Sequence, residues 1–206
     1  LCIMNKEQLA KAIQNAFTNG MDYAQYRSDI QKMVLLGKTS GENQSEAMVN
    51  YTKLNDQRMN RWDKKVHLST ELETSLKYIT SPQHWVVLTE AWCGDAAHNI
   101  PTLIKIAAVQ PLIQVKMVYR DENLELMDAF LTNGGRSIPK VILADKDFQP
   151  FASWGPRPEA CQKLYLQLKN EEADFETMKI ALQQWYNKNK QQALMSEFCD
   201  LIQQVV

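Results

Sequence analysis

The sequence has few of the residues that interrupt helices, with 7 glycines and 7 prolines among its 206 residues. This composition argues against a collagen and against a sandwich of many short strands, because both need more turn residues. A hydrophobic content of 45% argues against a disordered chain. The formal net charge of −1 provides no basic field that would gather nucleic acid. We therefore expect a globular, helix-rich protein that has no nucleic-acid partner.

Long apolar segments are also missing from the sequence. No window approaches the roughly 18 consecutive apolar residues that a membrane helix needs, and no basic stretch followed by an apolar one opens the chain. We therefore expect no membrane partner. The chain starts at Leu1, which leaves open a signal segment before it.

The cysteines do not form any recognised pairing pattern. Cys2, Cys93, Cys161 and Cys199 are widely spaced and contain no Cys-x-x-Cys pair, which fits neither a disulfide framework nor a zinc site. This usage favours a reducing compartment, so we predict a cytoplasmic protein. We expect no metal and no cofactor, and the sequence does not indicate an oligomeric state.

Hydrophobic periodicity predicts helical ends around a mixed centre. Apolar residues recur at helical spacing in the first eighty residues, which predicts helices over 6–17, 22–36, 45–64 and 69–79. Apolar runs rich in β-branched residues then alternate with helical patterns. They predict strands over 84–88, 113–119, 141–143 and 148–154, and helices over 95–109, 124–131, 159–169, 174–187 and 191–204. We divide the chain into an N-terminal helical extension (1–80), an α/β core (81–170) and a C-terminal helical extension (171–206).

The most informative segment is Trp92-Cys93-Gly94-Asp95-Ala96, which joins a predicted buried strand to a predicted helix. A cysteine at a helix N-terminus meets unpaired N–H groups and the positive end of the helix dipole. These groups favour thiolate and lower the pKa of such cysteines to roughly 3.5–7.5. The alternative is that Cys93 is a small apolar residue that fills the junction.

The motif resembles the Trp-Cys-Gly-Pro-Cys active site of the thioredoxin family at the same strand-to-helix junction. Pro101 matches the proline that kinks the family's active-site helix, and Ile138-Pro139 matches the segment with the cis-proline that faces the thiol. Gly155 matches the glycine of another loop of the substrate groove. The resemblance covers about 82–169. It implies an α/β thioredoxin-like fold, a mixed sheet of about four strands flanked by helices, with added helices at both ends.

The resemblance also implies a functional site around Cys93. Cys93 would be the catalytic thiol. The substrate groove would be lined by residues of the motif and the two loops, namely Trp92, Gly94, Asp95, Ala96, Ile138, Pro139, Gly155 and Arg157.

Three positions depart from the family pattern. Ala96 replaces the second cysteine, so Cys93 cannot close the usual vicinal disulfide. Val87 stands where thioredoxins often bury a carboxylate that serves this second thiol. Asp95 replaces the usual proline, and its negative charge should oppose thiolate formation at Cys93.

Other reactive side chains have weaker patterns. We interpret Cys161 as core and Cys199 as packing on the last helix. His98 is a surface or groove-wall histidine. Arg157 either binds a thiolate or carboxylate beside Cys93 or is a solvated loop residue. The basic stretch that begins at Arg58 should stabilise the C-terminus of its helix.

Two functions follow from these observations. In the first, the protein is a monothiol oxidoreductase. Cys93 attacks a protein disulfide, forms a mixed disulfide and is released by a low-molecular-weight thiol. In the second, a redox-silent module binds an extended polypeptide in the groove of Cys93, Pro139 and Gly155. A one-cysteine peroxidase and a cluster bridged between two chains are less favoured alternatives.

Overall fold

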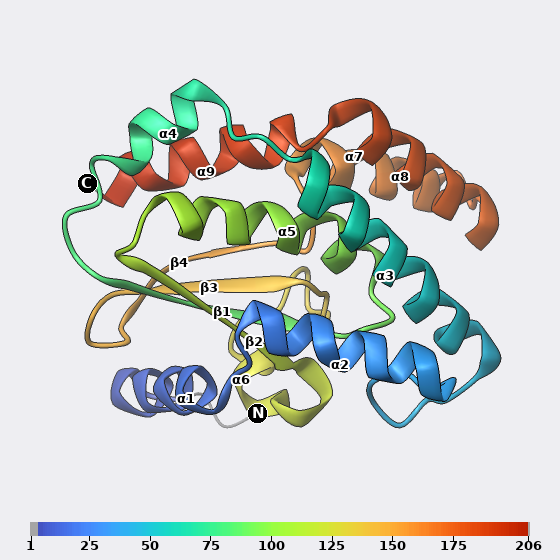
Figure 1. Cartoon of the computed structure of the whole chain (residues 1–206), viewed down its shortest axis with the longest axis horizontal. Helices are drawn as coiled ribbons and strands as arrows, with labels where there is room; N and C mark the ends of the chain where they lie inside the picture. Colours follow the sequence, from blue (N-terminus) through green and yellow to red (C-terminus); the bar gives the residue numbers. More distant parts are fainter. Residues whose placement is uncertain (1–3, 206) are drawn as a thin grey trace.

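A four-stranded mixed sheet forms the centre of the molecule in the computed structural model, which describes residues 4–205 (Figure 1). The strand order is β2-β1-β3-β4. The strands are β1 (Gln83–Thr89), β2 (Ile113–Tyr119), β3 (Lys140–Ala144) and β4 (Pro150–Trp154). β2 is parallel to β1, whereas β3 is antiparallel to both β1 and β4. The predicted mixed α/β sheet is therefore confirmed.

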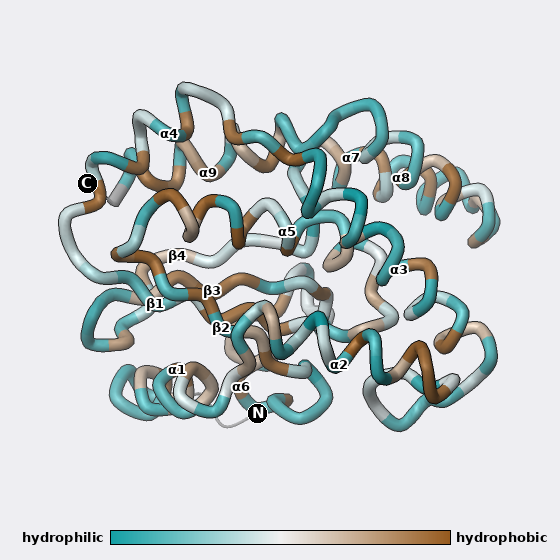
Figure 2. The backbone as a smooth tube through the Cα atoms, in the orientation of Figure 1, coloured by the Kyte–Doolittle hydropathy of each residue, from teal (hydrophilic) through white to brown (hydrophobic). Residues whose placement is uncertain are grey.

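The central strands are apolar on both faces because helices cover both. The last five residues of β1 and all of β3 are buried, which suits their β-branched composition. One face of the sheet is covered by α5 (Gly94–Val109) and by α9 (Gln192–Val205), whose Phe198 packs against Trp85 of β1 and Trp154 of β4. Helices α3 (Glu46–Lys65) and α4 (Thr70–Leu76) contact α5 (Figure 1). The opposite face is covered by α1 (Lys6–Asn19), beside α6 (Leu124–Asp128). Figure 2 shows the hydrophobic segments concentrated in the strands and in α5.

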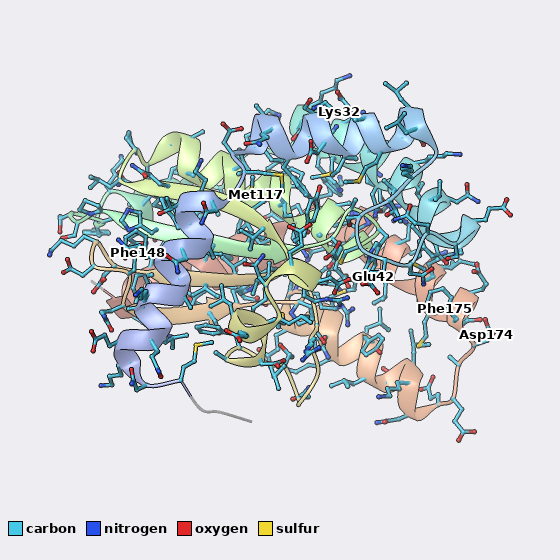
Figure 3. All side chains as sticks on the ribbon, turned by 90° about the horizontal axis from the view of Figure 1, so that it is seen from below. Lys32, Glu42, Met117, Phe148, Asp174 and Phe175 are labelled. Atoms are coloured by element: carbon cyan, nitrogen blue, oxygen red, sulfur yellow. The ribbon has the colours of Figure 1, made fainter. Side chains whose placement is uncertain are left out.

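The remaining helices pack at the periphery. α2 (Tyr23–Leu36) contacts α3 and β2, while α7 (Glu159–Asn170) contacts α8 (Phe175–Asn189). A short 3₁₀ helix, η1 (Arg120–Glu122), precedes α6. Figure 3 places Phe148 and Phe175 toward opposite ends of the molecule, so α8 lies far from the β3–β4 turn. The division into 1–80, 81–170 and 171–206 stays a prediction, because the helices of both ends pack closely on the central layers.

Local chemistry explains where the helices begin. Asn5 caps α1 in a reciprocal capping box with Gln8, and the side chains of Asp22 and Asp174 accept hydrogen bonds at the starts of α2 and α8. Such caps satisfy backbone N–H groups that have no partner inside the helix.

Five predicted boundaries are wrong by two or three residues. The helices expected to end at 17 and 187 continue to Asn19 and Asn189, and the other three differences have a local cause. The strand expected from Phe148 begins at Pro150, because the Asp145 carboxylate accepts N–H groups of Asp147 and Gln149 and holds a turn in which Phe148 has a φ of 60°. The helix expected over 124–131 ends at Asp128, where tighter i→i−3 hydrogen bonds replace the helical ones. The helix expected over 69–79 ends at Leu76 in the same way.

Candidate functional site

Cys93 is the N-cap residue of α5, immediately after the loop that leaves β1. Its Sγ accepts the backbone N–H of Ala96 at 3.4 Å and donates its proton to the carbonyl oxygen of Ile138 at 3.3 Å. The peptide bond that follows Ile138 is cis. The thiol is thus held between a helix N-terminus and the loop before β3, as the sequence predicts for this junction.

The environment of the Cys93 thiol favours its protonated form. Cys93 is only 7% exposed. Burial, and secondarily the negative charge of Asp95, raise the pKa of Cys93 from 9.0 to about 12, although the Ala96 N–H and the Arg157 cation act in the opposite direction. The expectation of a lowered pKa is therefore wrong, since desolvation outweighs the helix terminus. The opposing effect expected of Asp95 is present.

Asp95 is the centre of a buried polar network at the start of α5. Its Oδ2 accepts the Nε–H of Arg157 at 3.0 Å and also a hydrogen bond from Nη2, and its Oδ1 accepts the Tyr186 hydroxyl at 2.8 Å. The Asp95 and Arg157 side chains are 13% and 12% exposed. Tyr186 in turn accepts a hydrogen bond from Asn99. Asp95 therefore ties α5 to both the loop after β4 and helix α8.

Arg157 is not a solvated loop residue, so one of its two interpretations is wrong. The other is confirmed in part: the guanidinium is bound to Asp95, but its charge still lowers the pKa of Cys93. It also donates to Gln162 and lies over the Tyr165 ring, with its Cζ 4.4 Å from the ring centroid. Burial alone would lower the pKa of Arg157, but the ion pair with Asp95 outweighs burial and raises it.

A cavity of about 480 Å³ opens beside Cys93. Of the predicted site residues, six line it: Trp92, Cys93, Gly94, Asp95, Ile138 and Arg157. Three lie behind the wall. Ala96 is fully buried, and Pro139 packs so tightly against Gly155 that a Cβ on this glycine would lie 2.1 Å from the Pro139 oxygen. With a φ of 113°, Gly155 also has a backbone conformation that side chains disfavour.

Sequence reasoning missed two parts of the wall. Arg58 lies within α3, more than one turn before its end, and its Nη1 would be 3.2 Å from a Cβ at Gly94. Helix α8 contributes a stripe of mostly apolar side chains, from Phe175, Met178, Lys179, Leu182, Gln183 and Tyr186. The helical spacing of this stripe was visible in the sequence, but nothing in it indicated which neighbour the stripe faces.

His98 lies in the cavity wall and not on the surface. It is 3% exposed, and its ring stacks on Tyr186 with centroids 4.1 Å apart. Its Nδ1 accepts the indole N–H of Trp62 at 2.9 Å, so the proton of the neutral ring lies on Nε2, which faces Gln183 Oε1 at 3.2 Å. Burial lowers the pKa of His98 to about 3.

The other two cysteines in the described part of the chain do not line this cavity, although Cys161 lies close to Asp95, Arg157 and Tyr186 behind its wall. Cys161 is fully buried at the start of α7, and Cys199 is buried on α9, as the sequence predicts. Burial raises the pKa of Cys161 to about 12. Cys2 lies outside the described residues.

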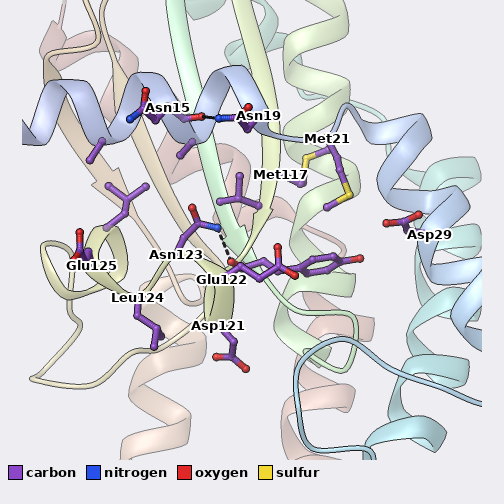
Figure 4. A pocket seen from close by; sticks show the side chains of 15 residues that line it. Asn15, Asn19, Met21, Asp29, Met117, Asp121, Glu122, Asn123, Leu124 and Glu125 are labelled. Carbon is purple, nitrogen blue, oxygen red and sulfur yellow. Dashed lines mark hydrogen bonds between the residues drawn. The ribbon is translucent and has the colours of Figure 1, made fainter.

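A larger cavity, of about 810 Å³, lies between α1, α2 and η1 (Figure 4). Four carboxylates line it, those of Asp29, Asp121, Glu122 and Glu125, and it contains no cysteine, histidine, lysine or arginine among the described residues. Within residues 4–205 no three histidine, cysteine or acidic side chains group to hold a metal ion. No helix in the same range is long and apolar enough to cross a membrane. The cavity beside Cys93 is therefore the candidate functional site.

Comparisons with known proteins agree with this geometry. A solved protein of unknown function from Pseudomonas aeruginosa is similar in fold, with a TM-score of 0.65 and 17% identity over 94% of this chain and 98% of that one. An HIV epitope-scaffold gives a TM-score of 0.63 with 18% identity, over 92% of this chain and 96% of its own. No curated protein matches the sequence. The family model described as thioredoxin matches residues 41–195, and the chain therefore belongs to the thioredoxin family.

Proposed function

We propose that this chain is a redox-silent binding protein of the thioredoxin family, whose ligand lies in the cavity beside Cys93. The observation that carries the proposal is the state of the thiol. Its proton is hydrogen-bonded to the Ile138 carbonyl, and burial raises the pKa of Cys93 to about 12. A thiol with this pKa is almost entirely protonated at neutral pH and is a poor nucleophile.

The surroundings of Cys93 support the same conclusion. Ala96 occupies the position of a resolving cysteine, and Val87, fully buried, occupies the position of its base. A cavity of about 480 Å³ with apolar walls and a few polar groups has the size and character of a ligand site. The redox-silent alternative of the sequence analysis places an extended polypeptide across Cys93, Pro139 and Gly155. Because the last two are turned toward each other, we place the ligand instead between Cys93, α3 and α8.

Monothiol disulfide exchange is the second candidate, and one contact favours it. The Ala96 N–H points at Sγ and would stabilise a thiolate once formed. In that reaction the Cys93 thiolate attacks a disulfide, one sulfur leaves as thiolate, and a mixed disulfide forms. An external low-molecular-weight thiol then attacks this mixed disulfide. It forms a disulfide with the substrate sulfur, and Cys93 leaves as the free thiolate.

The rate of iodoacetamide alkylation at Cys93, followed by peptide mass spectrometry across pH, separates the two candidates. Cys161 is a matched control in the same chain, because burial raises its pKa to a similar value. Binding alone predicts that both thiols react slowly at about pH 7 and that oxidised glutathione forms no adduct. Fast alkylation of Cys93 with an apparent pKa below about 7, together with an exchangeable glutathione adduct lost in Cys93→Ser, would overturn the binding proposal in favour of monothiol exchange.

A further inference from the structure

The cations around the Cys93 cavity are neutralised in all cases but one. Four of the five are paired with a carboxylate: Arg120 with Asp121, Arg136 with Asp128, Arg157 with Asp95 and Lys179 with Glu176. Arg58, the fifth, forms no ion pair with any residue in the part of the chain that the structure describes. Its charge is therefore available to a ligand.

Arg58 is held beside the thiol with most of its donors unused. Its Nη1 donates to Asn55 Oδ1 at 2.9 Å, and Asn55 is itself fixed by donating to the Ala91 carbonyl. Its Nε is buried and lacks a hydrogen-bond partner. An arginine has five N–H donors in a planar fork that matches a carboxylate. Asp95 makes no hydrogen bond or ion pair with Arg58, because its two oxygens face Arg157 and Tyr186.

The wall next to Arg58 is apolar. The ring centroids of Tyr51 on α3 and Phe175 on α8 lie 6.5 Å apart. Met48, about one helical turn before Tyr51, lines the same cavity. Met178 and Leu182 continue this wall along α8. Phe175 is 62% exposed, which is costly for a large aromatic side chain unless a ligand covers it. A charged end and an apolar side thus meet in one cavity.

We propose that the cavity binds a carboxylate that carries an aromatic or branched apolar group, with Arg58 on the carboxylate and the Tyr51–Phe175 wall on the apolar group. The ligand is either a small organic acid or the C-terminal residue of a peptide, since both present this chemistry. This inference rests on the proposed binding function.

The test compares matched probes that differ only in charge. Binding of 3-phenylpropionate and 3-phenylpropionamide is measured by ¹H–¹⁵N NMR titration on the whole chain, following the indole N–H of Trp92. Acetyl-Ala-Phe with a free carboxylate and its amide form the peptide arm. We expect the carboxylate of a pair to bind about tenfold more tightly than the amide, because a hydrogen bond between two charged groups is stronger than one to a neutral amide. The arm with the tighter carboxylate identifies the source.

Arg58→Gln should remove the preference for the carboxylate, whereas Arg61→Gln, on the same helix but outside the cavity lining, should retain it. Arg58→Lys, which keeps the charge, should retain part of it even if Arg58→Gln folds poorly. Equal binding of acid and amide to the wild-type chain, or an unchanged preference in Arg58→Gln, would overturn the carboxylate site and leave the binding function standing. Failure of every probe to bind would overturn the carboxylate site, and the alkylation of Cys93 would then decide the proposed function by itself. Reactive Cys93 with a retained acid preference would overturn only the redox-silent function.

Discussion

Replacing Asp95 by asparagine removes one charge from the network that joins α5, the loop after β4 and α8. The wild-type carboxylate neutralises Arg157 and accepts the Tyr186 hydroxyl. Asparagine has nearly the same shape, and its amide oxygen can still accept from Tyr186. Its NH₂ group, however, would face the guanidinium of Arg157, which would keep its positive charge inside the protein without a counter-ion.

The expected loss of stability follows from the burial of the pair. The two side chains are 13% and 12% exposed, so water screens them little. Removing one member of a buried ion pair costs about 3–5 kcal/mol, because the other charge stays desolvated. Arg157 retains its contacts with Gln162 and the Tyr165 ring, which places Asp95→Asn near the lower end. We expect the free energy of unfolding to fall by about 3 kcal/mol.

Urea denaturation of a double-mutant cycle measures this effect. Asp95→Asn and Arg157→Gln should each destabilise the chain. The double variant should lose clearly less stability than the sum of the two losses, because it removes both charges and leaves neither unpaired. A loss below about 1 kcal/mol for Asp95→Asn, or simple additivity, would refute the reasoning and reduce the pair to a weakly coupled surface contact.

The reactivity of Cys93 gives a second reading of the same variants. The charge of Asp95 raises the pKa of Cys93, and the charge of Arg157 lowers it. Asp95→Asn should therefore accelerate alkylation of Cys93 at a fixed pH, whereas Arg157→Gln should slow it. General loosening of the fold would accelerate both, so opposite signs identify the electrostatic effect.

Two further predictions concern His98 and the glycine of the β4 loop. Burial lowers the pKa of His98 from 6.5 to about 3, so below about pH 6.5 the unfolded chain binds a proton that the folded chain does not. The free energy of unfolding should therefore fall by about 2 kcal/mol between pH 7 and pH 5. Urea unfolding of His98→Gln should lack this component. Gly155→Ala should lower the thermal midpoint severely, because its Cβ would lie 2.1 Å from the Pro139 oxygen. Gly37 has a φ of 61° and open space around it, so Gly37→Ala should lower the free energy of unfolding by only about 1 kcal/mol. Similar midpoints for the two alanine variants would contradict the assigned contact.

The parts of the fold that the sequence predicts are those set by local chemistry. The start of α5 at Gly94 depends on a strand of apolar β-branched residues followed by a residue that can cap, and both signals are continuous in the sequence. Strand β2 has the predicted bounds because its run of mostly apolar and β-branched residues ends where the charged segment Arg120-Asp121-Glu122 begins. The last helices were found within a few residues for the same reason.

The candidate site needed information that no local pattern holds. Asp95 and Arg157 were each placed near the thiol, but their pairing across 62 residues depends on where the β4 loop meets α5. The prediction of a lowered pKa for Cys93 took account of the helix terminus but not of the desolvation that neighbouring elements cause. Arg58 was assigned only to a helix end. Its closeness to Gly94 could not be predicted, because it arises only when α3 packs on α5.

Asp95 looked in the sequence like an electrostatic cost to a catalytic thiol, and the structure gives it a different role. It stands at the first turn of α5, it holds Tyr186 of α8, and α8 supplies one apolar wall of the cavity. A proline at this position could hold neither Tyr186 nor Arg157. The Asp95 charge, which adds to the effect of burial in keeping the Cys93 thiol protonated, is thus the same charge that holds α8 over the cavity. One carboxylate therefore both opposes thiolate formation at Cys93 and positions one wall of the candidate site.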